Sequence, residues 1–162
     1  MLFDLKPSTP PQFVPFHVAP TSCAQLFPSG SPQAGSLLSA DHSVQATTDT
    51  NLVALLNAQP SLNCNWTNST SGLHVEVSVA LINASLISPL NTYLGTSFIG
   101  AGVGAGILSW DSETSPVDER HDVSTNDFWV VLRSNDGHAD NYDETVVESV
   151  WGLNGLSAAS FE

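Results

Sequence analysis

Residues 62–81 read LNCNWTNSTSGLHVEVSVAL, and apolar side chains alternate with polar ones at both ends of this stretch. In its second half, every other residue from Leu73 to Leu81 is apolar, with His74, Glu76 and Ser78 among the residues between them. Successive side chains of a strand point to opposite faces, so this pattern predicts a strand with one apolar and one largely polar face.

The first half of the stretch follows the same rule. It places Leu62, Cys64 and Trp66 on one face and the polar residues between them on the other. Residues 68–72 supply five turn-forming residues between the two halves. The sequence therefore predicts an antiparallel hairpin, with the apolar faces of both strands turned toward one core.

The size and charge of the chain limit its function. Its 162 residues suffice for one domain with a substantial core, and are too few for two. Three basic residues stand against 16 acidic ones, and the formal net charge is −13. Such a chain repels phosphate backbones and anionic membrane surfaces, so we expect neither nucleic acid nor lipid headgroups as partners.

The N-terminal part differs in composition from the rest. Residues 1–20 contain five prolines and no hydrophobic periodicity, so we predict a lead-in or linker there and a single domain over residues 21–162. Residues 1–6 lack the basic start and apolar run of a signal peptide. Either the protein is cytosolic or its signal sequence precedes this chain.

Other elements are expected before the hairpin. Short helices are predicted at residues 23–27, 31–38 and 51–57, the last capped by Asp49 or Thr50, and a short strand is predicted at residues 44–48. After the hairpin, residues 82–110 carry no charge and contain five glycines. A strand or loop in which small residues allow close approach of another segment is the favoured interpretation.

The remaining segments complete the predicted fold. Residues 111–127 are predicted to be an acidic connector, and residues 128–132 a strand covered on both faces. A closing helix is predicted to begin with Asp140 as its N-cap and to bury Tyr142, Val146, Val150 and Leu153. The order predicts an α+β fold, in which short N-terminal helices and a C-terminal helix pack on an antiparallel β-sheet.

The two cysteines lie in a recognisable pattern. Cys23 stands in Cys-x-x-Leu near the first short helix, and Leu-x-Cys64-x-Trp66 precedes the alternating valine strand. This pattern, from Thr21 to about Leu81, resembles uncharacterised secreted and lipoprotein-type domains common in actinobacteria. The second cysteine pair that such proteins sometimes carry is missing from this sequence.

The resemblance implies an extracytoplasmic location and a disulfide between Cys23 and Cys64, packed near Trp66, but no reaction. Closing a loop of about 42 residues would remove roughly 4 kcal/mol of unfolded-state entropy. The alternative is two buried thiols that behave as small hydrophobic groups. Since Trp66 shares the apolar face of the hairpin and Trp110 borders acidic residues, we expect Trp66 to contribute more to stability.

The glycine-rich segment does not predict a phosphate site. Glycines alternate strictly over residues 100–106, whereas a dinucleotide fingerprint needs G-x-G-x-x-G between a strand and a helix. The spacing of Gly100 and Gly104 also occurs in close-packed membrane helices. Residues 94–110 therefore support an alternative function as a membrane-interacting protein.

Acidic residues gather in two places. Residues 118–122, Asp-Glu-Arg-His-Asp, offer a carboxylate–histidine pair for acid–base chemistry, but no partner nucleophile is identified and a solvated connector is the favoured interpretation. Asp136, Asp140, Asp143 and Glu144 have the oxygen ligands that calcium prefers, but not the order of an EF-hand. A solvated loop with helix-capping aspartates is favoured there, and calcium binding is left open.

These patterns together predict no catalytic residue, metal site or cofactor. The five histidines are scattered, and no G-x-S-x-G motif is present. We therefore expect a non-catalytic secreted or cell-envelope module that binds a protein or a cell-envelope ligand, or has a structural role. Membrane association is expected only through an anchor upstream of this chain. The main alternative is a hydrolase that uses acidic residues within 111–144.

Overall fold

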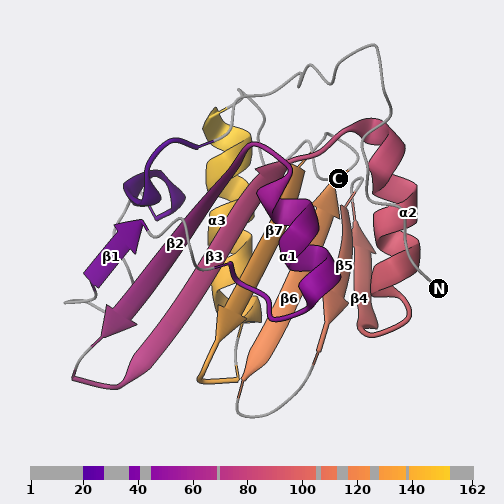
Figure 1. Cartoon of the computed structure of the whole chain (residues 1–162). Helices are drawn as coiled ribbons and strands as arrows, with labels where there is room; N and C mark the ends of the chain where they lie inside the picture. The colour runs from indigo at the N-terminus through magenta and orange to yellow at the C-terminus, as the bar shows by residue number, and fades with distance from the viewer. Residues whose placement is uncertain are drawn as a thin grey trace.

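The computed structural model describes residues 20–27, 37–40, 45–68, 70–104, 107–112, 117–124, 128–137 and 139–153. These form one seven-stranded antiparallel sheet in the order β1-β2-β3-β7-β6-β5-β4, with helices on both faces (Figure 1). The predicted α+β fold is confirmed. The proline-rich lead-in predicted for residues 1–20 lies outside the described residues, apart from Pro20.

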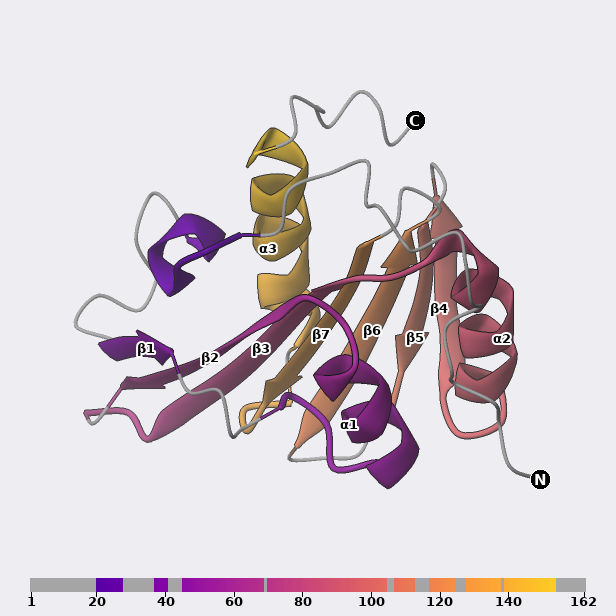
Figure 2. The ribbon, with the colours of Figure 1, turned by 45° about the horizontal axis from the view of Figure 1, so that its top comes forward.

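The strands are β1 (Leu37–Ala40), β2 (Ser61–Asn68), β3 (Leu73–Leu81), β4 (Ile99–Gly104), β5 (Ile107–Asp111), β6 (Asp118–Ser124) and β7 (Phe128–Ser134). The helical elements are the 3₁₀ turn η1 (Cys23–Leu26), α1 (Thr50–Asn57), α2 (Ala84–Leu94) and α3 (Asp140–Leu153). One core lies between the sheet and α3 with η1, and a second lies between the sheet and α1 with α2 (Figure 2).

The hairpin has the predicted register. Val75 and Val77 of β3 lie opposite Trp66 and Cys64 of β2, and all four side chains belong to the core under α3 and η1. Gly72 ends the turn with a φ of 77°, which a residue with a Cβ adopts at a cost. Cys23 and Cys64 form the predicted disulfide, which fastens η1 to β2.

The predicted difference between Trp66 and Trp110 agrees with their burial. Trp66 is 4% exposed and packs edge-on against Phe27, with ring centroids 4.1 Å apart. Trp110 is partly buried beside α2, and its indole N–H donates to Asn91. The strand predicted at residues 128–132 is also confirmed, since alternate side chains of β7 enter the two cores.

Two predictions before the hairpin are wrong. Residues 37 and 38, expected at the end of a helix, lie in β1, where they pair with β2. Residues 45–48, expected in a strand, are irregular, and the backbone N–H of Ala46 donates to Ser78 of β3 at 2.9 Å. This segment covers the polar face of β3, so Ser78 is fully buried. The helix predicted at residues 51–57 is α1, capped by Asp49.

The helix α2 lies within residues 82–110, for which the sequence favours a strand or loop, since Asn83 and Pro89 are unfavourable residues in a helix interior. Asn83 is instead the N-cap, and its side chain accepts from the backbone N–H of Ser85. Pro89 lies inside the helix, where it removes one backbone hydrogen bond. Burial of Leu86, Leu90 and Leu94, spaced four residues apart along one helix face, offsets that loss.

The closing helix is present, but its start differs by one residue. Asp140, the predicted N-cap, is the first residue of α3, and the N–H of the preceding Ala139 is held by Asp118. Tyr142, Val146 and Val150 are buried as predicted. Among the described residues, no helix combines the length and apolar character that crossing a membrane requires.

Candidate functional site

The acidic segment at residues 118–122 is not a solvated connector, and that prediction is wrong for residues 118–124. They form β6, which pairs with β5 on one side and β7 on the other. Alternation along the strand turns Glu119 and His121 toward the core under α1 and α2. Asp118, Arg120 and Asp122 point to the side of α3. Apart from the carboxylate–histidine pair, the contacts of these side chains with other strands were not identified from the sequence.

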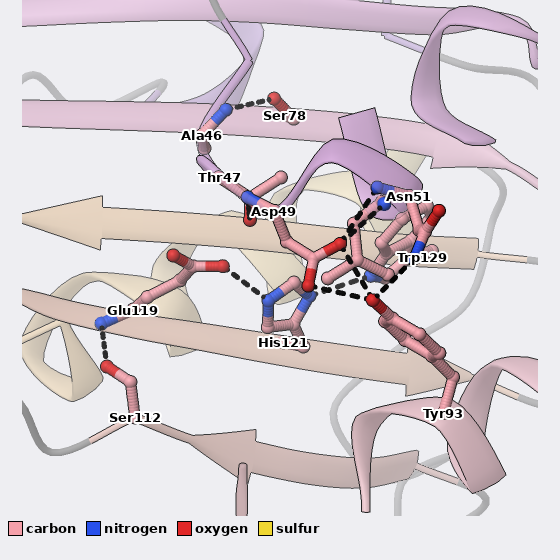
Figure 3. Close-up of polar contacts among 11 residues, drawn as sticks. Ala46, Thr47, Asp49, Asn51, Ser78, Tyr93, Ser112, Glu119, His121 and Trp129 are labelled. Carbon is pink, nitrogen blue, oxygen red and sulfur yellow. Dashed lines mark hydrogen bonds and ion pairs between the residues drawn. The ribbon is translucent and has the colours of Figure 1, made fainter. Parts of the chain in front are cut away.

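His121 is the centre of the first polar group (Figure 3). Its side chain is fully buried, its Nε2 lies 2.7 Å from Glu119, and its Nδ1 lies 3.1 Å from the indole nitrogen of Trp129. An indole N–H is only a donor, so Nδ1 is the acceptor and the ring proton lies on Nε2, directed at the carboxylate. The carboxylate–histidine pair suggested by the sequence exists, but both ring nitrogens are occupied.

The opposite face of β6 holds a second charged group. Arg120 contacts Asp111 at 3.2 Å and Asp122 at 3.7 Å, and these side chains are 5–17% exposed. The hydroxyl of Ser109 also donates to Asp122, at 2.5 Å. Asp118 accepts the backbone N–H of Ala139 at 3.0 Å. These acidic residues therefore join β5, β6 and the start of α3.

A third polar group connects α1 and α2, which lie on the face of the sheet opposite α3. The hydroxyl of Tyr93 in α2 lies 2.9 Å from Asp49, and Asn51 of α1 donates to the same hydroxyl at 3.0 Å (Figure 3). Burial raises the pKa of Tyr93, the hydrogen bond from Asn51 partly offsets this, and Asp49 raises the pKa again, so that the net shift is upward. Asp49 caps α1 with the same carboxylate, so this group fixes the position of α1 relative to α2.

An open, partly polar cavity lies at the end of the sheet where β3 begins and β7 ends. This cavity of about 320 Å³ is lined by the β2–β3 turn, the β7–α3 connection and the first turn of α3. Its lining residues are Ser71, Gly72, Leu73, Asn135, Asp136 and Tyr142. We call this cavity the end pocket.

Asn135 holds the two loops of the end pocket together. Its side-chain amide donates to the carbonyl of Gly72 at 2.9 Å, and its side-chain oxygen accepts the N–H of His74 at 2.8 Å. The turn itself is fixed by Asn68, whose side chain accepts the backbone N–H groups of Thr70 and Ser71. The pocket is therefore formed by loops with defined hydrogen bonds.

Asp136 supplies the charge of the end pocket. It accepts hydrogen bonds from the hydroxyls of Ser134 at 2.7 Å and Tyr142 at 2.8 Å. Burial, followed by the hydrogen bond and the charge of Asp136, raises the pKa of Tyr142 to about 12. Tyr142 thus remains a neutral donor, and neither hydroxyl neutralises the carboxylate.

The predicted calcium ligands are only partly described. Asp136 lines the end pocket, whereas the side chains of Asp140, Asp143 and Glu144 lie outside the described residues. Within the described part of the chain, no three acidic, histidine or cysteine side chains gather as a metal site would require. His17, His42 and His138 lie outside that part, and His74 contacts Glu76.

Comparison of the chain with models of protein families, with curated proteins and with solved structures found no match. The resemblance to actinobacterial lipoprotein-type domains therefore stays a prediction. The sequence also did not indicate the end pocket, because its two loops are more than 60 residues apart in the chain. The sequence showed the two loops separately, as a turn at residues 68–72 and an acidic loop at residues 136–144, and gave no sign that they meet.

Proposed function

We propose that this chain is a non-catalytic extracytoplasmic module that binds a small ligand, or one group of a larger partner, in the end pocket. The observation that carries the proposal is the end pocket itself, a polar cavity of about 320 Å³ between two loops. This volume lies at the lower end of the range for small-molecule sites. The loops are set on the central strands of the sheet, which provide a rigid support.

The disulfide supports the extracytoplasmic part of the proposal. Disulfides persist in oxidising compartments and are rare in the cytosol of most organisms. Cys23 and Cys64 are 7% and 2% exposed, and their bond joins the N-terminal turn to the central hairpin. A domain fastened in this way is suited to secretion or to the cell envelope.

The contacts of the charged residues in β6 support the non-catalytic part of the proposal. His121 has both nitrogens in hydrogen bonds, and Arg120 lies between two carboxylates in the interior of the sheet. A general base needs a nitrogen or oxygen within reach of its substrate. The hydrolase alternative, which needs acidic residues in this region, therefore receives less support than the binding function.

The membrane alternative also receives less support. Residues 94–110 contribute β4 and β5 to the sheet, and Ile99, at 58% exposure, is the large hydrophobic side chain that stands out from the described surface. Single exposed hydrophobic residues are common on soluble proteins, whereas a membrane site needs a contiguous patch.

The binding function is tested by NMR with a fragment library of neutral, anionic and cationic compounds. We expect saturable shifts of the backbone amides of Ser71, Gly72 and Asn135. Ser71→Tyr should fill the pocket and abolish them, whereas Thr70→Tyr, which changes the neighbouring exposed residue outside the lining, should not. Binding that Ser71→Tyr leaves intact, or no binding at all, would contradict the proposal.

The same protein tests the non-catalytic part. Turnover of an ester, glycoside or phosphate substrate that Asp122→Asn abolishes in a variant with a native NMR spectrum would favour the hydrolase. The compartment is tested by reduction of the disulfide, which should lower the free energy of unfolding by about 2–5 kcal/mol. Equal stability of the oxidised and reduced protein would show that the bond between Cys23 and Cys64 does not stabilise the fold, and would remove its support for an extracytoplasmic location.

A further inference from the structure

We propose that His121 is an acid-sensitive element of the fold, in which a second proton on the imidazole removes the hydrogen bond from Trp129 and loosens the core under α1 and α2. This inference goes beyond the proposed function, because it does not involve the end pocket and is tested separately. It starts from the position of the imidazole, which is fully buried on β6 between β5 and β7.

The two ring nitrogens of His121 respond to acid in opposite ways. Nε2 lies 2.7 Å from Glu119 and donates to it, so a positive charge on the ring would strengthen this contact. Nδ1 lies 3.1 Å from the indole nitrogen of Trp129 and accepts its proton. Because Nε2 already carries a proton, a second one must go to Nδ1. Two N–H groups would then face each other, and the indole would lose its acceptor.

Burial makes this conflict costly. His121 and Trp129 are each 0% exposed. The imidazole also packs against the edge of Phe98, with ring centroids 4.6 Å apart, and stacks on Trp129 at 5.9 Å. A fully buried donor that loses its acceptor cannot turn to bulk water. The imidazole and the indole must therefore move apart before the ring can hold two protons.

The titratable and charged side chains on this side of the sheet come from several elements. They are His74 and Glu76 of β3, Arg133 of β7, Glu119 of β6, Asp49 at the start of α1 and Tyr93 of α2 (Figure 3). The carboxylates favour a positive ring, whereas burial and Arg133, which lies opposite Glu119 in the register, oppose it. The hydrogen bond from Trp129 is the contact that the second proton must break.

The consequence is a loss of stability in acid. A histidine in the unfolded chain takes up its second proton at about pH 6.5, and there it has no such hydrogen bond to lose. The unfolded state then binds more protons than the folded state, so the free energy of unfolding decreases as the pH falls through this range. Trp129 belongs to the core that also contains Leu52 of α1 and Leu90 of α2, so this core should loosen first.

Two tryptophan variants separate this effect from the titration of the other acidic groups, which the variants share. Trp129→Phe removes the indole N–H, so a second proton on Nδ1 no longer breaks a hydrogen bond. The control is Trp110→Phe, since Trp110 lies opposite His121 on β5 but its indole donates to Asn91. Urea denaturation at about pH 7.5 and about pH 5.0, on either side of the histidine range, gives the unfolding equilibrium constant of each protein.

At the higher pH Trp129→Phe should be the less stable protein, and in acid this difference should shrink. We expect the ratio of its unfolding constant to that of the unmodified chain to fall about tenfold between the two pH values, since the unmodified chain alone loses the hydrogen bond. The same ratio for Trp110→Phe should change by less than about twofold. A constant ratio for Trp129→Phe, or an equal fall in both variants, would overturn the proposal.

NMR of the unmodified chain decides the question if Trp129→Phe does not fold. The indole N–H signal of Trp129 should move with the same pH midpoint as the 15N signals that report a second proton on His121. An imidazole that keeps one proton until the chain unfolds would also support the proposal, because the folded state then excludes the second proton. An indole signal that stays unchanged while the imidazole carries two protons would overturn it.

Discussion

Two acidic segments of this chain look alike in sequence and lie in opposite environments. Residues 118–122 belong to a strand inside the sheet, where Arg120 contacts Asp111 of β5, His121 contacts Glu119 of the same strand and Trp129 of β7, and Asp118 accepts the N–H of Ala139 just before α3. Asp136 lies in an exposed loop and faces the end pocket. The comparison teaches that a run of charged residues does not specify solvent exposure. What matters is whether the strands on either side supply opposite charges and donors.

The largest expected effect is on the buried segment. Arg120→Met keeps the aliphatic packing but leaves Asp111 and Asp122 without the cation between them, so we expect a loss of about 3–5 kcal/mol in the free energy of unfolding. Urea denaturation measures it. The exposed Glu148→Ala should change stability by less than about 0.5 kcal/mol. A loss below about 1 kcal/mol for Arg120→Met would show that the charges around Arg120 behave like a solvent-exposed ion pair, and would contradict the difference between the two segments.

The next effect separates two tryptophans in the same sheet. Trp129→Phe removes the donor to the buried Nδ1 of His121, and an unpaired buried acceptor costs about 1–3 kcal/mol. Trp110→Phe removes a hydrogen bond to Asn91 at a partly buried position, which water can replace, and should cost less. Denaturation curves of the two variants check the difference, and equal losses would contradict it.

The imidazole itself offers a direct check on this assignment. The 15N spectrum of His121 should show a proton on Nε2 and none on Nδ1 in the unmodified protein. In Trp129→Phe the Nδ1 signal should move, since its donor is gone. A protonated Nδ1 in the unmodified protein would mean that Trp129 does not donate to it.

At the end pocket we expect Tyr142 to make the stability of the fold depend on pH. The raised pKa of Tyr142 means that folding favours its protonated form. This stabilisation is fully present below the ordinary pKa of 10.0 and is lost as the pH rises through about 12. Asp136→Asn removes two of the three causes and leaves burial, so the pKa should fall but stay raised. Absorbance titration in a Tyr93→Phe background, which leaves one tyrosine, measures it.

The smallest expected effect concerns calcium. Millimolar calcium should raise the melting temperature by no more than about 2 °C, which corresponds to less than about 1 kcal/mol in a domain of this size. Magnesium should do as much, since both ions only screen a polyanion. A saturable, calcium-selective stabilisation that Asp136→Asn abolishes would show that the loop at residues 136–144 is a metal site.

Some elements could be predicted because their signals are local. The alternation of Val75, Val77 and Val79 specifies a strand face without reference to the rest of the chain, and so does the apolar run of β7. The helix α2 was hidden by Pro89, which lowers helix propensity locally but is tolerated when Leu86 and Leu90 are buried. β6 was hidden because its partners lie in other strands.

The end pocket could not be predicted for a related reason. Ser71 and Asp136 lie close together because β3 and β7 pair, and this pairing brings Val75 opposite Ser134. Neither loop has a sequence pattern that indicates contact with the other. The disulfide, in contrast, was suggested by a resemblance that involved only Cys23, Cys64 and their neighbours.

One titration tests most directly whether the two acidic segments have different roles. Fragment binding, read from the saturable shifts of the Ser71, Gly72 and Asn135 amides, is measured by NMR for Asp122→Asn and Asp136→Asn, together with the melting temperature of each variant. We predict that Asp122→Asn melts at the lower temperature and binds within about twofold of the unmodified chain, whereas Asp136→Asn melts closer to the unmodified chain and binds more weakly. The reverse pattern, with binding lost in Asp122→Asn while the fold persists, would contradict this account.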